Sequence, residues 1–476
     1  MIAERPQPTT TDFRPLFEEQ RRRHLADPYP SLAERIKRLD ALERAIVAHR
    51  RDVSSAIAAD FGKSRDESEF TEIVLTLGEL RLARRRLAKW MKPRTVRTPL
   101  IVFPAASQRR YEPRGVVLVM GPFNYPFQLA MVPLIAALAA GNRAIVRLSE
   151  KVPRTRDVVA AIIAEAFAPT EVACVGGEID AAQALLELPF DHFFFTGSTA
   201  VGKVVMGAAA KHMASVTLEL GGKSPAIVHG DADVALAASR VAFGKGVNAG
   251  QTCIAPDYAL AHQSVADDFA ARVADTFGKM YGRDAGARKA TPDFCRMIDD
   301  AAFARVTGLI EASVAAGARI VFGGASDARE RFIEPTVLTG VTWDMPIMRE
   351  EIFGPVLPVV SYASLDDELA RIRSRPKPLA LYPFSTSKQT VAHILAQTTS
   401  GSVLVNDTLL QWANYNLPMG GVGDSGQGGY HGIDGFRAFS HERAVMRQSR
   451  FTLAPLLAPP FGTTFRVLLK VMERLP

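Results

Sequence analysis

Residues 116–120, Val-Val-Leu-Val-Met, open a stretch in which short apolar runs alternate with helical segments as far as residue 222. Continuous apolar runs predict strands buried on both faces, and strands separated by helices predict a parallel sheet covered on both sides. Such a sheet binds ligands outside the carboxyl ends of its strands. The other strands expected here are residues 144–146, 172–175, 193–195 and 216–220.

A second round of alternation follows residue 253 and predicts a second α/β domain, with Glu219 and Cys253 near the seam. Its expected strands are residues 258–260, 320–322, 357–360, 379–381 and 402–405. Before the first sheet, residues 13–90 have helical spacing. The apolar stripe of this lead-in is expected to pack on the later sheet. It consists of Leu32, Ile36, Leu39, Leu42 and Ile46.

Prolines interrupt the helical pattern after residue 92, and residues 108–111 then form a short extended segment. Such a segment serves either as an arm for self-association or as a plain loop. We expect a cofactor-binding domain, a catalytic domain, an extended oligomerisation arm and a C-terminal tail. Their expected bounds are 1–94 with 114–221, 222–425, 95–113 and 426–476, respectively.

The last residues, 451–476, alternate prolines with an amphipathic run. Three interpretations stay open for this tail: it covers a pocket mouth, binds a neighbouring chain, or touches a membrane surface, the last being the least favoured. The longest apolar stretch, residues 129–140, is too short to span a bilayer and predicts a buried helix.

Composition places the chain among ordinary soluble globular proteins, because 47% of its residues are hydrophobic and 22% are charged. Three cysteines cannot form a disulfide framework, and the first residues lack the apolar core of a secretory signal. Both observations favour a cytoplasmic location. The net charge of +7 comes with clumps of arginine, as at residues 21–23 and 84–86. We interpret them as a solvated basic face rather than a nucleic-acid site, because no recognition motif accompanies them.

The stretch Asn-Ala-Gly-Gln-Thr-Cys-Ile, residues 248–254, carries Cys253 in a turn of small residues. A thiol exposed by such a turn is a candidate nucleophile, since thiolates attack carbonyl carbon well. A buried cysteine that only packs as a small hydrophobe is the alternative. The histidines and cysteines show no metal-ligand spacing, so no metal is expected.

Residues 195–203, Phe-Thr-Gly-Ser-Thr-Ala-Val-Gly-Lys, lead from an expected strand into a helix. A Gly-Ser turn at a helix N-terminus presents free amides to a phosphate. The spacing nearly matches a nucleoside triphosphate P-loop, but Val204 follows where a hydroxyl should bind magnesium. We therefore favour a dinucleotide pyrophosphate site. Residues 423–426, Gly-Asp-Ser-Gly, resemble a serine protease motif without its secreted, disulfide-bonded setting, and predict a glycine-rich loop.

Five motifs occur in the order found in the aldehyde dehydrogenases, which the chain resembles from residue 110 to residue 445. The tail pattern around residues 430–441 is similar to the class 3 branch, and residues 406–410 are similar to the bacterial coniferyl aldehyde dehydrogenases. The motifs are residues 121–126 (Gly-Pro-Phe-Asn-Tyr-Pro), 195–203, 218–223 (Leu-Glu-Leu-Gly-Gly-Lys) with the Cys253 turn, 350–355 (Glu-Glu-Ile-Phe-Gly-Pro) and 418–423 (Pro-Met-Gly-Gly-Val-Gly).

The resemblance implies an NAD(P)-dependent oxidation of an aromatic or medium-chain aldehyde to its acid, carried out by a homodimer. It implies that Cys253 is the nucleophile, that Asn124 is an oxyanion donor, and that Glu219 is the base for thioester hydrolysis. The cofactor would contact Gly197, Ser198, Gly202, Leu220, Glu351 and Phe353. By adjacency, the substrate pocket would include Tyr125, Thr252 and Ile254.

The sequence departs from the family pattern at one position that would contact the cofactor. Arg147 and Glu150 occur in Arg-Leu-Ser-Glu, where the family usually has Lys-Pro-Ser-Glu. The planar guanidinium of Arg147 suits a 2′-phosphate, so we hypothesise that it favours NADP, whereas the carboxylate of Glu150 would repel that phosphate. Two other functions stay open: an enzyme whose thioester is resolved by CoA or phosphate, and a non-catalytic relative with the same fold.

Overall fold

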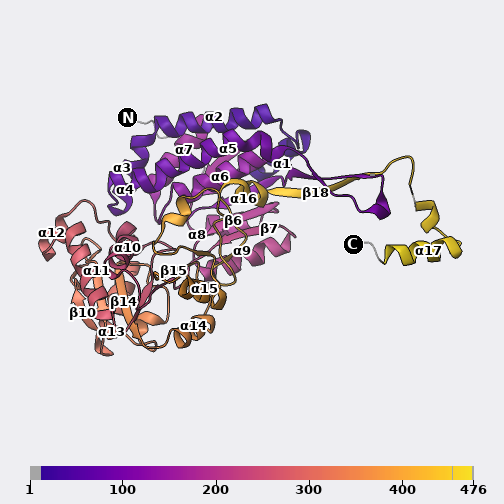
Figure 1. Ribbon diagram of the computed structural model, residues 1–476. Helices are drawn as coiled ribbons and strands as arrows, with labels where there is room; N and C mark the ends of the chain where they lie inside the picture. The colour runs from indigo at the N-terminus through magenta and orange to yellow at the C-terminus, as the bar shows by residue number, and fades with distance from the viewer. Residues whose placement is uncertain (1–11, 453, 474–476) are drawn as a thin grey trace.

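The computed structural model describes residues 12–452 and 454–473. Two α/β units lie side by side, and a thin arm extends away from them (Figure 1). This arrangement confirms the α/β fold class predicted from the alternation of strands and helices.

The first sheet has six strands in the order β17-β7-β6-β3-β4-β5. All neighbouring strands are parallel except β17, which runs antiparallel to β7. The expected strands of this sheet are confirmed within one or two residues. They are β3 (Val116–Met120), β4 (Arg143–Arg147), β5 (Val172–Val175), β6 (His192–Thr196) and β7 (Ser215–Glu219), with the added edge strand β17 (Gly426–Gln427).

Helices cover both faces of this sheet. On one face lies α6 (Gln128–Ala140), the buried helix expected at residues 129–140, in which every residue is buried. Phe13 and Phe17, at the start of α1 (Arg14–Ala26), pack with Val116 and Leu118 on the opposite face. The remaining helices of this unit are α7 (Pro153–Ala166), α8 (Ile179–Leu186) and α9 (Thr199–Lys211).

The lead-in helices form a third layer, and here one expectation was wrong. The stripe of α2 (Leu32–Ala48) buries Leu39, Leu42 and Ile46, but it packs on α5, α6 and α7 instead of on the sheet. The sheet face is already occupied by α6 and α7, so the stripe buries its apolar surface against those helices. This layer also contains α3 (Arg50–Phe61), α4 (Arg65–Ser68), a π-helical turn (Glu69–Val74) and α5 (Leu75–Met91).

The second sheet has seven strands in the order β10-β13-β14-β9-β8-β15-β16. Sequence reasoning missed β8 and β13, which are four residues long and have a proline at or just before their start, where it interrupts no ladder bond. The strands are β8 (Pro225–Val228), β9 (Tyr258–His262), β10 (Arg319–Phe322), β13 (Thr336–Thr339), β14 (Val356–Tyr362), β15 (Ala380–Phe384) and β16 (Ser402–Val403).

Two layers of helices cover the second sheet, and a small hairpin lies at its edge. The helices α10 and α11 pack on one side, whereas α13, α14 and α15 contribute to the core of the other. Their bounds are α10 (Val234–Gly246), α11 (Ala266–Tyr281), α12 (Ala285–Ala290), α13 (Asp300–Ala315), α14 (Leu365–Arg373) and α15 (Lys388–Gln397), with the hairpin of β11 (Ser326–Asp327) and β12 (Phe332–Ile333).

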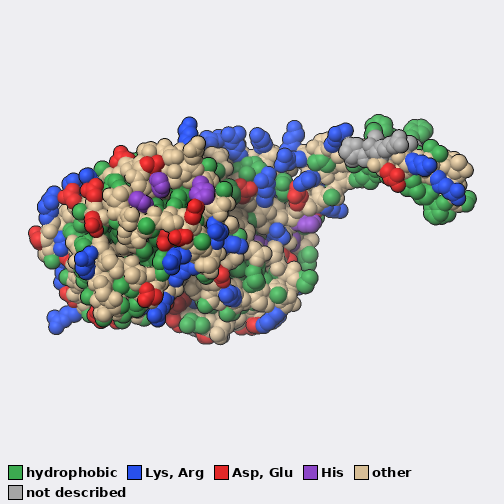
Figure 2. All heavy atoms as spheres, turned by 60° about the horizontal axis from the view of Figure 1, so that its bottom comes forward, with side chains coloured by type: hydrophobic (Ala, Val, Ile, Leu, Met, Phe, Trp, Pro, Cys, Tyr) green, Lys and Arg blue, Asp and Glu red, His purple; other side chains and the backbone are tan. Residues whose placement is uncertain are grey.

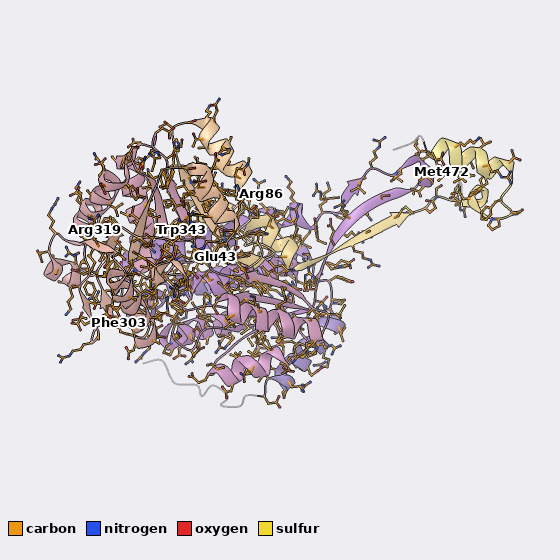
Figure 3. The ribbon with its side chains drawn as sticks, turned by 90° about the horizontal axis from the view of Figure 1, so that it is seen from below. Glu43, Arg86, Phe303, Arg319, Trp343 and Met472 are labelled. Carbon is orange, nitrogen blue, oxygen red and sulfur yellow. The ribbon has the colours of Figure 1, made fainter. Side chains whose placement is uncertain are left out.

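The arm is a three-stranded antiparallel sheet of β1 (Arg94–Val96), β2 (Ala106–Pro113) and β18 (Ser440–Arg447). After α16 (Gly432–Ala438), the C-terminal segment therefore joins the arm. Beyond it, α17 (Thr463–Met472) lies at the far end. Met472 is remote from Phe303 and Trp343 in the second unit (Figure 3), so the described end of the tail lies away from that unit of the same chain. Among the described helices, none is long and apolar enough to cross a membrane.

Basic side chains gather along the upper edge of the body and on the arm (Figure 2). Several of the arginine clumps carry acidic partners. Arg84 contacts Asp40 and Glu43, and Arg109 contacts Glu442, all on the surface. Paired, solvated side chains of this kind contribute little to stability.

Candidate active site

The strands of the first sheet end along one side of a cleft of about 960 Å³. The register pairs Met120 with Arg147, and Thr196 with Glu219, so four strand ends meet at one edge. Parallel strands put their ligand sites at this edge. The cleft is lined by most residues predicted from the motifs: Asn124, Arg147, Glu150, Gly197, Ser198, Glu219, Cys253, Glu351 and Phe353.

The turn before Cys253 has an uncommon backbone. Asn248, Ala249 and Gly250 all have positive φ angles, of 54°, 48° and 70°. A side chain at Gly250 would place its Cβ 2.2 Å from the carbonyl oxygen of Gly354, so only glycine lets this turn pack against the loop of Phe353. The result is that Cys253, which is half-buried, lines the cleft and also a second, apolar cavity.

Asn124 is held beside this turn by two amides. Its Nδ2 donates to the carbonyl oxygen of Gln251 at 2.9 Å. The Nδ2 of Asn248 in turn donates to the carbonyl oxygens of Asn124 and Gln251. Sequence reasoning assigned no role to Asn248 or Gln251, because amides in a loop carry no motif that reveals their partners.

Glu219 is a buried carboxylate without a partner. It is 4% exposed, and neither carboxylate oxygen has a hydrogen bond among the described residues. The nearby Lys223 does not satisfy it, because Lys223 pairs with Asp257 and donates to the carbonyls of Ile347 and Glu350. Burial raises the pKa of Glu219 well above its ordinary value, which makes it a good proton acceptor once ionised.

The thiol of Cys253 is neutral at rest in this environment. Burial, together with the nearby charges of Glu351 and Glu219, raises its pKa to about 12. The nucleophile therefore needs a base or a positive charge to become a thiolate. Burial also raises the pKa of the Cys174 and Cys295 thiols. Neither residue lines the cleft or the apolar cavity.

The wall of the cleft contains further buried polar atoms that have no hydrogen-bond partner among the described residues. These atoms are the hydroxyl oxygen of Thr196 and the Nε of Arg147, in addition to the two carboxylate oxygens of Glu219. Buried polar groups are ordinarily paired, so their concentration on one wall fits a polar ligand. Thr196 was missed from the sequence, because a threonine at a strand end is not distinctive by itself.

The positions predicted to hold a phosphate lie at the start of α9. Ser198 caps this helix, and its hydroxyl accepts a hydrogen bond from the Val201 amide. Gly202 and Leu220 do not line the cleft. A Cβ at Gly202 would lie 2.7 Å from a methyl of Leu220, so the glycine lets α9 pack tightly against the end of β7.

The loop of Glu351 and Phe353 lies on the opposite side of the cleft. A Cβ at Gly221 would lie 2.1 Å from a Glu351 carboxylate oxygen, so this carboxylate rests against the backbone after β7. Burial and the charge of Asp257 raise the pKa of Glu351 to about 8. The ring of Phe353 lies edge-on to Phe123 at 5.8 Å.

The guanidinium of Arg147 already has hydrogen-bond partners within the protein. Its Nη2 donates to Glu150 at 2.8 Å and to the carbonyls of Gly177 and Glu178. The Glu150 carboxylate thus offsets the charge that was expected to attract a 2′-phosphate.

The segment that nearly matches a P-loop, residues 195–203, contacts the Gly-Asp-Ser-Gly loop, residues 423–426, at the protein surface. Lys203, the lysine of the near P-loop, lies 3.5 Å from Asp424 and is largely exposed. Ser425 is fully buried and its hydroxyl bonds with the backbone of Val422. The loop that contains it pairs Gly426 with Glu219 and so closes the sheet beside the site.

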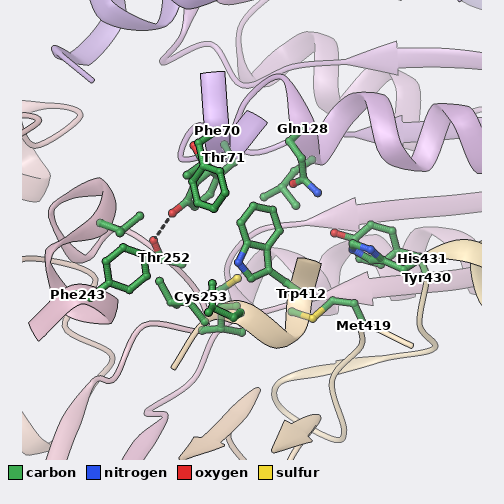
Figure 4. A pocket seen from close by; sticks show the side chains of 16 residues that line it. Phe70, Thr71, Gln128, Phe243, Thr252, Cys253, Trp412, Met419, Tyr430 and His431 are labelled. Atoms are coloured by element: carbon green, nitrogen blue, oxygen red, sulfur yellow. Dashed lines mark hydrogen bonds between the residues drawn. The ribbon is translucent and has the colours of Figure 1, made fainter. Parts of the chain in front are cut away.

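The second cavity is narrow and apolar, with about 50 Å³ of space, and Tyr125, Thr252 and Ile254 all line it. The Tyr125 hydroxyl lies 2.7 Å from that of Thr252 (Figure 4). Sequence reasoning did not find the other walls, which come from distant segments. They are Phe70, Phe243, Leu409, Trp412, Met419, Tyr430 and His431, among others.

Comparison with known proteins agrees with this geometry. The model of the aldehyde dehydrogenase family matches residues 7–445. The chain belongs to the aldehyde dehydrogenase family. A 4,4'-diaponeurosporen-aldehyde dehydrogenase of Staphylococcus aureus is 44% identical over 91% of this chain and 93% of its own. A probable coniferyl aldehyde dehydrogenase of Pseudomonas aeruginosa is 42% identical, with 95% and 94% covered.

Two further aldehyde dehydrogenases are informative. A rat enzyme described as dimeric and NADP-preferring is 41% identical over 88% of this chain and 91% of its own. The solved structure of a substrate-bound Staphylococcus aureus AldH has a TM-score of 0.93 and 41% identity, and covers 97% of this chain and 99% of that one. These relatives confirm the predicted resemblance to the class 3 branch and to the coniferyl aldehyde dehydrogenases.

Proposed function

We propose that this chain oxidises an apolar aldehyde, aromatic or medium-chain aliphatic, to its carboxylic acid with NAD or NADP. The observation that carries the proposal is the position of Cys253, which lines the apolar cavity on one side and the polar cleft on the other. A carbonyl carbon entering through the apolar cavity meets the thiol where the cofactor cleft begins.

In the first step the Cys253 sulfur bonds to the aldehyde carbon, and the thiol proton leaves to solvent water in the cleft. The carbonyl oxygen becomes an oxyanion, which the Asn124 amide and the Cys253 backbone N–H stabilise. The fixed position of Asn124, tied to Gln251 and Asn248, keeps this donor preorganised. Such preorganisation is what makes oxyanion donors effective.

The thiohemiacetal then loses hydride and becomes a thioester on Cys253. When bound, NAD or NADP supplies the hydride acceptor. Glu219 takes a proton from water, which attacks the thioester carbon; the C–S bond breaks, the acid is released, and the proton on Glu219 returns to the Cys253 sulfur. The unpaired, buried carboxylate of Glu219 supports water as the nucleophile. For that reason transfer to CoA or phosphate and a non-catalytic role are not favoured.

The cleft residues fit a dinucleotide. Ser198 and the first amides of α9 would hold the pyrophosphate, with Gly197 leaving room for it and with Gly202 and Leu220 fixing the helix. Glu351 would accept hydrogen bonds from the nicotinamide ribose, and Phe353 would pack beside the ring. Arg147 and Glu150 would meet the adenosine ribose at the ends of β4 and β5.

The choice between the two cofactors depends on Glu150. Replacing Glu150 with glutamine removes a negative charge and releases the Arg147 guanidinium for a 2′-phosphate. We expect kcat/KM with NADP to rise about tenfold relative to NAD, as initial rates with both cofactors would show. The change should be lost in the double variant that also carries Arg147→Lys. An unchanged ratio in Glu150→Gln would show that this pair does not set cofactor preference.

The reaction itself is tested with the unmodified protein. A panel of cinnamaldehyde, benzaldehyde, hexanal and decanal, assayed with NAD and NADP, should yield reduced cofactor and free acid. Adding CoA or phosphate should leave the acid as the product. An acyl-CoA or acyl phosphate would support the rival enzyme class, and no turnover of any aldehyde would contradict the proposed function.

Assembly and location are proposals that complete this picture. We infer a homodimer, supported by the projecting arm and by the dimeric rat relative, and its mass in solution is the test. The free thiols of Cys174, Cys253 and Cys295 support a reducing, cytoplasmic setting. The domain bounds given above stay a prediction, in which the arm serves oligomerisation.

A further inference from the structure

The segment of residues 63–72 in the helical layer contacts both loops that carry the oxyanion donor and the nucleophile. It contains α4 and the start of the π-helical turn. Phe70 and Thr71 in this turn line the apolar cavity together with Cys253 (Figure 4). Short π-helical turns are rare and occur frequently at functional sites. The reaction proposed above gives no role to the charged side chains of this segment.

Glu72 fixes the chain just after Asn124. Its Oε2 accepts hydrogen bonds from the backbone amides of Phe127 at 2.8 Å and Gln128 at 3.2 Å. These amides lie at the N-terminal boundary of α6, where no local side chain supplies a cap. A carboxylate is stabilised at this end of a helix by the free amides and by the helix dipole. Glu72 therefore caps α6 and sets the point at which the Asn124 loop joins this helix.

Lys63 ties Glu72 to the residue that follows Asn124. Its Nζ donates to Oε1 of Glu72 at 3.0 Å, and both side chains are fully buried. The same ammonium group lies 4.0 Å from the centroid of the Tyr125 ring. A buried ion pair adds little net stability, because desolvation opposes the attraction between the charges. What the pair does here is hold Glu72 and Tyr125 in one fixed arrangement.

Glu67 holds the turn that carries Cys253. Its Oε1 accepts a hydrogen bond from the backbone amide of Asn248 at 2.7 Å. The Nδ2 of Asn248 then donates to the carbonyl oxygens of Asn124 and Gln251, at 2.9 and 3.0 Å. One short segment of the helical layer thus holds both sides of the oxyanion site, through Glu72 on one loop and Glu67 on the other.

We propose that Glu67 and Glu72 are positioning residues that set the distance between the Asn124 amide and the Cys253 sulfur. The proposal rests on the oxidation proposed above, in which the amide stabilises the oxyanion formed at that sulfur. Neither carboxylate lines the cleft or the apolar cavity, so both act through the backbone amides that they bind. A displacement of about 1 Å at a catalytic group can cost on the order of 10²-fold in rate.

Replacing Glu67 with leucine removes the acceptor for the Asn248 amide. We expect kcat and kcat/KM with cinnamaldehyde and NAD to fall together by about tenfold, with KM unchanged, because an oxyanion donor acts in the transition state. Glu67→Gln keeps an acceptor oxygen and should restore most of the rate. The matched control is Asp66→Leu, the same substitution at the adjacent, exposed acid, which should leave the rate unchanged.

A double-mutant cycle with Asn124→Ala separates positioning from a general structural role. Asn124→Ala by itself should lower kcat by on the order of 10²–10³. In that background Glu67→Leu should cost less than about twofold more, because the donor that Glu67 positions is already gone. A loss of about tenfold in both backgrounds would overturn the proposal. So would a folded Glu67→Leu enzyme with the kcat of the unaltered enzyme.

Glu72 offers a second comparison, which does not depend on whether Glu67→Leu folds. Lys63→Met/Glu72→Gln and Lys63→Met/Glu72→Met both replace the buried ion pair with neutral side chains of similar size. Only the glutamine keeps an acceptor for the Phe127 amide. We expect kcat to be about tenfold higher with glutamine, and the difference should disappear once Asn124→Ala is added. Equal kcat in the two double variants would overturn the role of Glu72, whereas no turnover by the unaltered enzyme would contradict the proposed oxidation instead.

Discussion

Replacing Cys253 with serine is expected to lower kcat by on the order of 10⁴ or more, with little change in the folded structure. The serine hydroxyl ionises far less readily than a thiol and makes a poorer acyl leaving group in the second half of the reaction. The surroundings amplify this difference, since burial and the nearby Glu351 and Glu219 charges already oppose ionisation at position 253. Initial rates of cofactor reduction with cinnamaldehyde measure the effect.

The matched control is Cys174→Ala. Cys174 lies on β5, outside both cavities, and has no part in the proposed chemistry. This variant should keep the activity of the unaltered enzyme. Comparable activity in Cys253→Ser would remove the thiol from the mechanism, whereas loss of activity in both variants would indicate damage to the fold.

Replacing Glu219 with glutamine should separate the two halves of the reaction. Acylation of Cys253 releases one equivalent of reduced cofactor, but hydrolysis lacks its base and slows by about 10²–10⁴-fold. A rapid-mixing experiment should therefore show a burst close to the enzyme concentration, followed by a slow steady state. The control is Glu311→Gln, a substitution at an exposed position on α13, which should keep the steady-state rate of the unaltered enzyme.

The pH dependence gives a second view of Glu219. Because burial raises its pKa, the carboxylate forms only at higher pH than for an ordinary glutamate. Hydrolysis needs the ionised form, so the steady-state rate should rise with pH through the raised pKa and reach a plateau above it. The same limb should be absent from Glu219→Gln. A burst-free Glu219→Gln variant with the unaltered pH profile would assign hydrolysis to another group.

Much of this site is predictable because strand ends define it. The apolar run that ends at Met120 and the one that ends near Glu219 predict two positions at the same sheet edge, and the register places both there, with the end of β6 between them. The turn before Cys253 is also distinctive, since Asn248 and Gly250 are residue types that favour the positive φ angles found there. Motifs of this kind depend on local backbone geometry, which the local sequence largely determines.

The remainder depends on packing between distant segments. An amphipathic stripe on α2 predicts burial, but it cannot distinguish a sheet from the helices that cover it. The pairing of Glu79 with His431 joins α5 to the residue before α16, and nothing in either segment marks the other. For Arg147, the opposing carboxylate of Glu150 is visible in the local sequence, whereas the hydrogen bonds of its guanidinium to the carbonyls of Gly177 and Glu178 come only from the fold.

The most direct test of the central claim is the mass of the covalent intermediate. Glu219→Gln enzyme, mixed with cinnamaldehyde and NAD and then quenched in acid, should gain the mass of one cinnamoyl group. Peptide mapping should place that group on Cys253, with no adduct in Cys253→Ser/Glu219→Gln. Turnover of the aldehyde without any acyl adduct, or with the adduct on Cys174 or Cys295, would contradict the thioester mechanism at Cys253.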